Sequence, residues 1–472
     1  MGTTITHKLR RVEPKALAAA VEALAAQFGN RLVTSQAVRE QHAHTTTWLE
    51  SQPPDAVVFA QETADVQEVV RICARHGVPI IAFGTGTSLE GQVNAPAGGV
   101  CIDFRDMDKV LEVHAEDLDC VIQPGVTRKA LNEHLRDQGL FFPIDPGADA
   151  SLGGMASTRA SGTNAVRYGT MRENVLALKV VRGDGEIITT GTRAKKSSAG
   201  YDLTHLFIGA EGTLGIITEL TIKLRGIPET IAAAACSFDT VGGACQAVIM
   251  AIQTGIPVAR IELLNADQVR ACNSYSKLSL PETPLLLLEF HGSEAEVAEQ
   301  SRNFGEIAAE CGGGDFTWTT RPEDRSKLWQ ARHDVYWAVK ALRPGAGAVA
   351  TDVCVPISRL ADCVTETEAD LKRLRLQSPI VGHVGDGNFH CSLLCDLNDS
   401  DEMARGEEFM HRLVERAQSM GGTCTGEHGI GQGKQKYLKT EIGQEAIDAM
   451  RAIKQAMDPQ NIFNPGKIIP AA

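Results

Sequence analysis

The chain has 472 residues, of which 43% are hydrophobic and 22% charged, and its formal net charge at pH 7 is −13. This length exceeds what one hydrophobic core organises, so we expect two or three domains. The acidic charge and the absence of a Lys/Arg block argue against a nucleic-acid partner. They do not exclude a small anionic substrate, because a few local cations can outweigh the field of the whole molecule.

No segment of the sequence is typical of a membrane-spanning or secreted protein. The N-terminus lacks an apolar core of signal-peptide length, and no apolar run reaches the roughly 18 residues of a membrane span. Met1-Gly2 with Thr6 matches a myristoylation pattern only loosely. The twelve cysteines include no Cys-x-x-Cys, and most stand in apolar surroundings, as reduced, buried thiols do. We therefore expect a soluble cytoplasmic protein, and peripheral attachment to the inner membrane stays open.

The first half of the chain alternates helices with short β segments. A helix is predicted at 14–28, where Pro14 stands near the start. A second helix is predicted at 63–76, with Gly77 as its stop. The other predicted elements of this half are strands at 56–60, 78–83, 100–104, 120–123, 175–182, 186–190 and 215–224, and a helix at 129–138.

The pattern changes after Pro228, where an alanine-rich β segment begins. Long helices then alternate with strands, which fits helices packed on a mostly antiparallel sheet. The last twenty residues look like a tail that docks elsewhere. The predicted elements of this half are helices at 241–254 and 293–311 and strands at 258–263 and 285–290.

Two histidines bracket a tight turn in the second half. The β segments 379–384 and 389–394 flank Gly-Asp-Gly-Asn, so antiparallel pairing would place His383 and His390 side by side. Glu427, in a glycine-rich loop, could add a carboxylate oxygen. Two imidazoles and one carboxylate form the three-ligand site typical of catalytic divalent metals.

The neighbouring His428 is then left over as a candidate base. The alternative interpretation is that these histidines are hydrogen-bonded core residues and that the glycines only form turns.

A glycine loop follows the strand predicted at 78–83. Its sequence, Gly84-Thr85-Gly86-Thr87-Ser88-Leu89, resembles a dinucleotide fingerprint, but Leu89 stands where the third glycine is required. The next residues include Pro96 and cannot form a helix, so the helix dipole of a Rossmann unit is missing. Successive backbone N–H groups of the loop can still bind a pyrophosphate. A plain turn is the alternative.

Two further stretches are unusually rich in small residues. One runs from Pro143 to Ser157 and continues to Gly169, and the other covers Glu211–Ile217. So many small residues exceed the needs of packing and indicate backbone that lies against a flat, extended ligand.

The order of these motifs resembles that of the FAD-linked oxidases of the vanillyl-alcohol-oxidase type, which carry a PCMH-type FAD-binding domain. Within that family the chain is similar to the D-2-hydroxyacid dehydrogenases, and the segments 329–333 and 351–360 are most similar to cytochrome-linked D-lactate dehydrogenases. Seven motifs follow the family's order over about residues 50 to 470: Gly84–Ser88, Asp145–Gly154, Ser161–Gly169, Glu211–Ile217, His383–His390, Gly426–Gly431 and Asn464–Lys467.

The resemblance implies an α+β fold with a two-subdomain FAD-binding domain and an α+β cap domain that binds the substrate on an antiparallel sheet. We expect an N-terminal helical segment at 1–50, the FAD-binding domain at 51–228 and the cap domain with the metal site at 229–445. A C-terminal segment at 446–472 is expected to dock on the FAD-binding domain and return to the flavin.

The resemblance also implies where FAD binds. The pyrophosphate is expected on the glycine loop, and the loop Pro146–Ser161, the segment Glu211–Ile217 and the tail are expected to hold the rest. The flavin is expected to be noncovalent, because no histidine lies between His76 and His114 and the nearby cysteines sit inside predicted elements. The expected FAD-binding residues are Gly84, Thr85, Gly86, Thr87, Ser88, Leu89, Pro146, Gly147, Ala148, Ser151, Gly153, Gly154, Ser157, Ser161, Gly162, Tyr168, Glu211, Gly212, Gly215, Ile216, Ile217 and Asn464.

For the reaction, the resemblance implies that the alcohol carbon gives a hydride to the flavin N5. Arg332 is expected to pair with the substrate carboxylate, and His428 to take the hydroxyl proton. Asn388 is expected to hold the same carboxylate or the hydroxyl. A divalent metal, Zn²⁺ or Mn²⁺ with Fe²⁺ also compatible, is expected on His383, His390 and Glu427.

The expected substrate is a D-2-hydroxy acid. Relatives that take dicarboxylates carry a lysine two positions before the residue that matches Asp352, and Ala350 stands there in this chain. This favours a monocarboxylate such as D-lactate, unless Arg343 or Lys340 compensates.

Several alternatives stay open at the level of the sequence. They are a flavin subunit of a glycolate oxidase complex, a D-2-hydroxyglutarate-type dehydrogenase and a sensor without enzymatic activity. The external electron acceptor, whether a cytochrome, a quinone or an electron-transfer flavoprotein, is undetermined, as is the formation of a homodimer.

Overall fold

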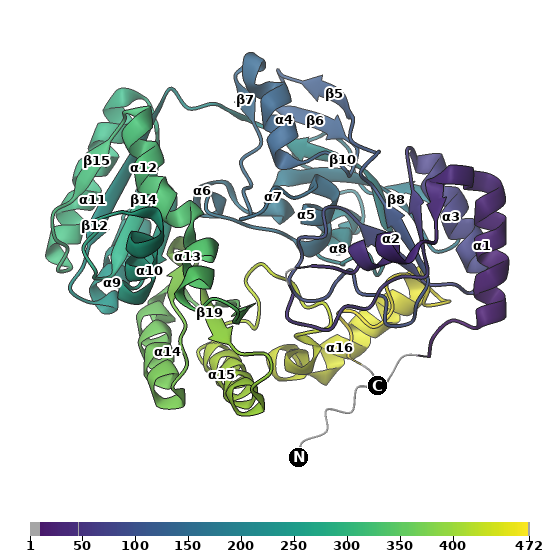
Figure 1. Ribbon diagram of the computed structural model, residues 1–472. Coiled ribbons are helices and arrows are strands. Elements are labelled where there is room, and N and C mark those ends of the chain that lie inside the picture. Colours follow the sequence, from purple (N-terminus) through teal and green to yellow (C-terminus); the bar gives the residue numbers. More distant parts are fainter. Residues whose placement is uncertain (1–9, 46, 471–472) are drawn as a thin grey trace. The chain divides into compact units, whose positions relative to one another are not determined.

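The computed structural model describes residues 10–45 and 47–470, and the chain divides into two compact units. Unit 1 consists of Met1–Ala160, Thr170–Gly226 and Glu427–Ala472, and unit 2 consists of Ser161–Gly169 and Ile227–Gly426. Each unit therefore collects segments that are distant in the sequence (Figure 1).

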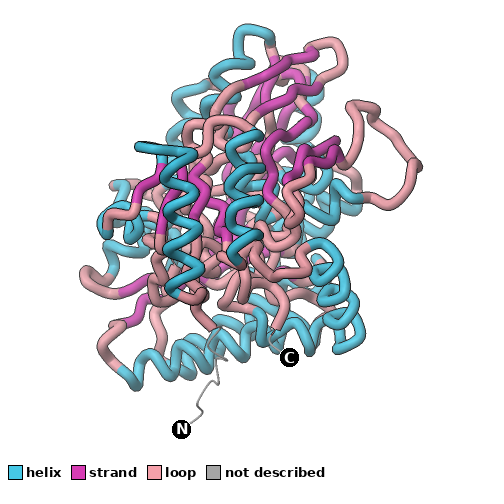
Figure 2. The backbone as a smooth tube through the Cα atoms, turned by 90° about the vertical axis from the view of Figure 1, so that its right-hand side faces the viewer, coloured by secondary structure: helices cyan, strands magenta, loops and turns pink. Residues whose placement is uncertain are grey.

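Unit 1 begins with a four-stranded sheet of order β1-β2-β4-β3, in which β2, β4 and β3 run parallel. Helices α1 and α3 lie side by side against it, and Figure 2 shows them in front of the strands. The elements of this subdomain are α1 (Pro14–Phe28), β1 (Leu32–Val33), α2 (Gln36–Gln41), β2 (Ala56–Phe59), α3 (Thr63–His76), β3 (Ile80–Phe83) and β4 (Val100–Asp103).

The local sequence explains the two long helices of this subdomain. Helix α1 starts with Pro14 in its first turn, and its buried residues Ala20, Leu24 and Phe28 recur every fourth position, on one face. Helix α3 stops at Gly77, which takes the left-handed conformation that glycine adopts without strain. Both predicted helices are confirmed with the bounds expected from the sequence.

The second sheet of unit 1 is antiparallel, with the order β5-β6-β10-β8-β9, and a two-stranded sheet pairs β11 with β7. The predicted hairpin at 175–190 is confirmed as β8 and β9. The elements are β5 (Val110–His114), β6 (Asp119–Ile122), α4 (Arg128–Leu135), β7 (Leu140–Phe141), α5 (Leu152–Thr158), α7 (Met171–Asn174), β8 (Val175–Val181), β9 (Ile187–Thr189), α8 (Leu203–Phe207), β10 (Ile216–Lys223) and β11 (Arg225–Gly226).

One expectation for this subdomain is wrong, because the stretch Pro146–Ser161 is not a loop throughout. Residues Leu152–Thr158 form helix α5 in spite of two consecutive glycines, which disfavour helices in isolation. A Cβ added to Gly153 would lie 2.5 Å from Cβ of Pro124, so the helix packs too closely for a larger residue there. Tertiary packing overrides the local propensity.

The C-terminal segment of unit 1 contains helix α16 (Leu438–Met457) and a tail that pairs with the edge of the first sheet. Phe463 forms a parallel bridge with Ile80, and the backbone N–H of Asn464 donates to the Ile80 carbonyl over 2.9 Å. This pairing brings Asn464 beside the strand that leads into the glycine loop.

Unit 2 contains a mostly antiparallel sheet of order β15-β12-β14-β13-β18-β19-β16, with β17 also paired to β19. Helices α9 to α12 pack against it (Figure 1). The elements are α6 (Ala165–Tyr168), β12 (Thr230–Ser237), α9 (Val241–Gln253), β13 (Val258–Leu264), α10 (Ala266–Ser276), β14 (Leu285–Gly292), α11 (Glu294–Glu310), β15 (Thr317–Thr319), α12 (Pro322–His333), α13 (Val335–Leu342), β16 (Gly347–Ala350), β17 (Val353–Cys354), α14 (Leu360–Leu374), β18 (Ile380–Gly382), β19 (Asn388–Cys395) and α15 (Ser400–Ser419).

Two expectations from the composition can be compared with the structure. All twelve cysteines are free thiols, ten of them buried, as the sequence predicts. None of the helices built from the described residues has the length and apolar character needed to cross a bilayer. The myristoylation pattern at Met1-Gly2 lies outside the described residues.

Candidate active site

The glycine loop of unit 1 follows β3 and touches the start of helix α5. A Cβ added to Gly84 would lie 2.0 Å from the hydroxyl oxygen of Ser151, so only glycine allows this approach. Gly86 has φ +68°, a conformation that residues with a Cβ seldom adopt. The structure thus brings together the glycine loop and the stretch of small residues that contains Ser151, both of which the sequence predicted to bind a ligand.

This junction, which we call the cradle (Gly84–Leu89, Gly147–Ser157 and Glu211–Gly215), has polar groups without partners. The side-chain oxygens of Ser88 and Ser151 are buried, and no described residue offers either a hydrogen bond. A Cβ added to Gly147 would meet no described atom within 4 Å, and one on Gly212 would meet only Ala82. Buried hydroxyls beside backbone with open space suit an extended polar ligand such as a dinucleotide.

The cradle is closed by Glu211 and Asn464, two residues in the left-handed conformation, with φ +50° and +38°. The Asn464 side-chain N–H groups donate to the Glu211 carbonyl over 2.8 Å and to the Gln92 carbonyl over 3.0 Å. The Glu211 N–H donates to the Ser157 carbonyl over 2.8 Å. Strained residues held by several neighbours are typical of functional sites.

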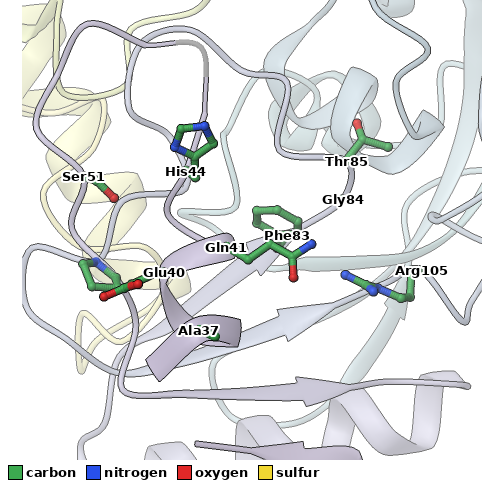
Figure 3. Close-up of a pocket in the computed structure, with 10 residues that line it drawn as sticks. Ala37, Glu40, Gln41, His44, Ser51, Phe83, Gly84, Thr85 and Arg105 are labelled. Carbon is green, nitrogen blue, oxygen red and sulfur yellow. The ribbon is translucent and has the colours of Figure 1, made fainter. Parts of the chain in front are cut away.

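A cavity of 1040 Å³ opens at the start of the glycine loop, within unit 1 (Figure 3). Phe83, Gly84 and Thr85 line one side of it, and Arg105 contributes a guanidinium that points toward the cavity. Pockets that enclose a mid-sized organic ligand have comparable volumes. The other lining residues are Ala37, Glu40, Gln41, His44, Ser51 and Pro53.

The side chain of Glu211 holds the loop that carries Glu427 and His428. Its carboxylate accepts hydrogen bonds from the backbone N–H groups of Ile430 and Gly431 over 2.8 and 2.9 Å. Burial raises the pKa of Glu211 to about 7, although these two N–H groups lower it. The Gln92 amide also donates to the His428 carbonyl over 2.8 Å. The loop, which we call the base loop (427–431), is thus fixed at several backbone atoms.

Lys467, in the Asn-Pro-Gly-Lys motif, is the cation of this region and is buried. Its ammonium donates to the Asn94 carbonyl over 2.7 Å and to the Asn464 side-chain oxygen over 3.2 Å. Burial lowers the pKa of Lys467 to about 7, and the charge of Glu211 raises it.

Three of the predicted FAD-binding residues, Ser161, Gly162 and Tyr168, belong to unit 2. The Tyr168 hydroxyl lies 2.8 Å from Nδ1 of His291, whose Nε2 lies 2.7 Å from the Glu289 carboxylate. Tyr168 is therefore part of a polar chain with His291 and Glu289 within unit 2.

The predicted histidine pair lies on the hairpin of β18 and β19, where Val381 pairs with His390. The rings of His383 and His390 are buried, and their centroids are 5.4 Å apart. Nδ1 of His383 lies 2.6 Å from the Glu262 carboxylate, and Nδ1 of His390 lies 3.1 Å from the Thr351 carbonyl. Because both acceptors require a proton on Nδ1, the lone pair of each ring is on Nε2. That is the tautomer of a metal-ligating histidine, so the two rings fit a divalent ion.

Glu262 joins this pair to the predicted anchor for the substrate carboxylate. It is fully buried in β13, and its second oxygen accepts a hydrogen bond from Nε of Arg332 over 2.7 Å. Burial raises the pKa of Glu262, but its interactions with His383 and Arg332 lower it by more, so its net pKa is below the ordinary value.

Asn388 is held so tightly that one of its two expected roles is incompatible with the structure. Both hydrogens of its amide nitrogen are used, over 2.7 Å each, by the Asp352 carboxylate and the Val353 carbonyl. A carboxylate needs a donor, so Asn388 does not offer the group that would bind one. Its side-chain oxygen, an acceptor, is compatible with a substrate hydroxyl.

The predicted site residues therefore fall in both units. Unit 2 holds Arg332, His383, Asn388 and His390, whereas Glu427 and His428 open the last segment of unit 1, directly after Gly426.

The sequence reasoning missed the residues that hold these side chains, above all Glu262. The signal was present, since Glu262 is the carboxylate in an otherwise strand-like run, Val258–Leu264. A charged side chain in a strand that is covered on both faces of its sheet indicates a buried partner of opposite charge or a hydrogen-bond donor.

The fold matches those of solved structures. The solved structure titled p-cresol methylhydroxylase with substrate bound superposes with a TM-score of 0.80, covering 97% of each chain at 18% identity. The 4-ethylphenol oxidase of Gulosibacter chungangensis gives 0.79, covering 97% of this chain and 98% of the other, also at 18% identity. The α+β fold class expected from the sequence is confirmed.

The family follows from the sequence comparisons. Residues 54–191 match the family described as "FAD binding domain", and residues 227–468 match "FAD linked oxidases, C-terminal domain". The chain belongs to the FAD-linked oxidase family, and the resemblance drawn from its motifs is confirmed.

Three curated relatives cover nearly the same length. The probable mitochondrial D-lactate dehydrogenase of Danio rerio is 52% identical, over 96% of this chain and 92% of the relative. The mitochondrial D-lactate dehydrogenase (cytochrome) of Arabidopsis thaliana is 46% identical, over 88% and 74%. A glycolate oxidase subunit of Bacillus subtilis is 35% identical, over 92% and 93%.

Proposed function

We propose that this protein oxidises a D-2-hydroxy acid to the 2-oxo acid, with D-lactate as the preferred substrate. The observation that carries the proposal is the buried Glu262, which holds a carboxylate-binding arginine on one side and a ligand-type histidine on the other. A cation beside two imidazoles suits a substrate that has a carboxylate next to a hydroxyl. The names of the curated relatives support the same substrate.

Each reacting group of the substrate has a proposed partner in the chain. With Nε of Arg332 engaged by Glu262, the two terminal nitrogens of the guanidinium are left to bind the carboxylate. His428 takes the hydroxyl proton, and the Asn388 oxygen orients the hydroxyl before that proton leaves. Bound FAD would supply the acceptor for the hydride that leaves the alcohol carbon, so one proton and one hydride balance the oxidation.

We propose a divalent metal on His383, His390 and Glu427. The Nε2 tautomers of both histidines support the nitrogen ligands, and the carboxylate follows from the sequence motif. Such an ion would lower the pKa of a hydroxyl bound to it. Zn²⁺, Mn²⁺ and Fe²⁺ all suit one oxygen and two nitrogen ligands.

A monocarboxylate is supported by the two cations that could have served a second carboxylate. Arg343 forms an ion pair with Glu402, with a shortest N–O distance of 2.6 Å. The Lys340 ammonium donates to the Ala346 carbonyl over 3.0 Å. Both cations are already bound to groups of unit 2. Neither therefore replaces the lysine that relatives with dicarboxylate substrates carry at the position of Ala350.

We propose that the flavin is bound without a covalent link. The nearby thiols of Cys73 and Cys101 are fully buried, and burial raises the pKa of both, so neither forms a reactive thiolate. Acid precipitation should release FAD into the supernatant.

The second candidate is a flavin subunit of a glycolate-oxidising complex, which the Bacillus relative favours. The two candidates differ in what the purified chain does alone. A self-sufficient dehydrogenase reduces its flavin with D-lactate and passes the electrons to an external acceptor, for which a dye can substitute.

The test is anaerobic flavin reduction of the purified protein, followed by stopped flow, with D-lactate, L-lactate, glycolate and D-2-hydroxyglutarate. We expect rapid reduction by D-lactate and slow reduction by the other three. Equal rates with both lactate enantiomers would refute the proposed function, and faster reduction by glycolate would favour the second candidate.

A further inference from the structure

Glu262 stands at a position where a carboxylate is costly. Strand β13 lies inside the sheet, between β14 and β18, and the Glu262 side chain has no exposed surface. Removing an ionised carboxylate from water costs several kcal/mol, which close cationic donors must offset. A residue kept at such a cost is a candidate for a specific task.

The sheet register brings Glu262 to the histidine pair. Strand β13 pairs with β18 through Leu263 and Gly382, so the next step of the antiparallel register sets Glu262 opposite His383. The distance of 2.6 Å from Nδ1 of His383 to the carboxylate follows from this backbone pairing.

The second contact of Glu262 orients Arg332, in the last turn of α12. The Nε donor is bound by the carboxylate over 2.7 Å, and the Arg332 side chain stays 18% exposed. A guanidinium held at Nε has a fixed plane, so the direction of its two terminal nitrogens is also fixed.

We propose that Glu262 is a positioning residue that sets two properties with one carboxylate, the tautomer of His383 and the orientation of Arg332. The inference rests on the proposed function, since it assigns metal binding to His383 and carboxylate binding to Arg332. His390 differs, because its Nδ1 lies closest to a backbone carbonyl, that of Thr351 at 3.1 Å, with the Asp352 carboxylate at 3.7 Å.

Replacement of Glu262 by glutamine separates charge from shape. The amide oxygen can serve only one of the two donors, and the amide N–H₂ then faces the other. If the oxygen keeps Arg332, the N–H₂ donates to Nδ1 of His383, which moves the ring proton to Nε2 and removes the metal-binding lone pair. If the oxygen keeps His383, Nε of Arg332 meets a donor and the guanidinium turns away.

The experiment uses the flavin-loaded protein with three variants, Glu262→Gln, Glu262→Asp and Asp370→Asn. Asp370 is the matched control, because it is also a buried carboxylate of unit 2 that binds cations, and its three arginines, Arg373, Arg412 and Arg416, are not among the predicted site residues. Two quantities are measured, namely the affinity of the chelator-treated protein for Mn²⁺ and the KM and kcat for D-lactate.

We expect Glu262→Gln to bind Mn²⁺ about 10- to 100-fold more weakly, the usual effect of losing a carboxylate behind a ligand histidine. KM for D-lactate should rise by at least about tenfold, the effect of losing one charge-assisted hydrogen bond. Glu262→Asp, shorter by one methylene, should show both effects in weaker form, and Asp370→Asn should show neither. The FAD content should be unchanged in all three.

The proposal is overturned if Glu262→Gln keeps the wild-type values of both quantities, whereas a change in only one of them identifies the partner that lost the amide oxygen. If Glu262→Gln does not fold, wild-type values in Glu262→Asp overturn it instead. A wild-type protein that takes up no Mn²⁺ would refute the metal part of the proposed function, and the role of Glu262 toward Arg332 would then be decided by KM alone.

Discussion

Two buried glutamates, one in each unit, hold the predicted reacting groups by different means. Glu262 in unit 2 binds two side chains, the Arg332 guanidinium and the His383 imidazole. Glu211 in unit 1 binds backbone N–H groups, those of Ile430 and Gly431. Burial raises the pKa of both carboxyls, but only Glu262 forms an ion pair with an arginine, so its net pKa falls, whereas that of Glu211 rises to about 7 even though the charge of Lys467 lowers it.

The comparison teaches that the partner decides what a buried carboxylate can do. Neutral N–H groups fix the position of a loop without stabilising a charge fully, so Glu211 titrates near neutral pH. The cationic Arg332 keeps Glu262 ionised, and the carboxylate can then orient side chains that act on a substrate. The four predictions below test this difference, starting with the largest effect.

The first prediction concerns what each unit contributes to the reaction. His428→Ala, in the base loop, should lower kcat for D-lactate by roughly 100- to 10,000-fold, the usual loss for a general base. KM should change little, because the carboxylate anchor in unit 2 is intact. Stopped-flow flavin reduction measures the step directly. Reduction at the wild-type rate would mean that another group takes the proton.

The second prediction concerns the cost of removing the charge partner. Glu262→Leu leaves Arg332 without its counter-ion in a largely buried position and should destabilise unit 2 by about 3–5 kcal/mol. Denaturant unfolding, followed by the fluorescence of Trp318, Trp329 and Trp337, reports on this unit. The double variant with Arg332→Leu should recover most of the loss, and failure to recover would show that packing, not charge, is what Glu262 supplies.

The sequence predicted many of the local elements that carry these contacts. Helices α1 and α3 were predictable because Pro14 and Gly77 mark a start and a stop that depend on local geometry. The hairpin with His383 and His390 was predictable because Gly-Asp-Gly-Asn separates two β segments.

The contacts themselves were not predictable from local patterns. Glu262 and His383 are 121 positions apart and meet only because β13 and β18 are neighbours in a sheet whose strand order the sequence does not state. Helix α5 was missed because Gly153 fits its packing against Pro124, whereas propensity predicts a loop. The attachment of Ser161, Gly162 and Tyr168 to unit 2 also depends on long-range contacts, such as that of Tyr168 with His291.

The third prediction concerns pH and applies to Glu211 alone. Its folded-state pKa of about 7 is above the ordinary value of 4.5, so protonation of Glu211 favours the folded state. Its contribution to the free energy of unfolding is fully present below pH 4.5 and is lost as the pH rises through 7. Relative to Glu211→Gln, the wild-type protein should gain about 2 kcal/mol in its free energy of unfolding from pH 7 to pH 5.

The Lys467 ammonium acts in a different window. Its folded-state pKa is lowered to about 7, so its contribution is complete above its ordinary value of 10.5 and is lost as pH falls toward 7. Lys467→Met should therefore alter the pH profile chiefly above pH 7, and it should raise the pKa of Glu211 further, because the charge of Lys467 lowers that pKa. An identical slope in wild type and Glu211→Gln between pH 5 and pH 7 would contradict the assignment.

The smallest expected effect concerns the hydrogen bond from Gln92 to the backbone of the base loop. Gln92→Met removes the hydrogen bond from the Gln92 amide to the His428 carbonyl, worth about 1 kcal/mol. If that bond keeps His428 in place for proton transfer, kcat should fall about fivefold with KM unchanged. Gln123→Met is the matched control, because Gln123 is also buried in unit 1 and exchanges hydrogen bonds with two backbone groups, the Lys109 N–H and the Gln61 carbonyl. Both variants should lose similar stability, but only Gln92→Met should lower kcat. Equal kcat values in the two variants would mean that Glu211 alone positions the base loop.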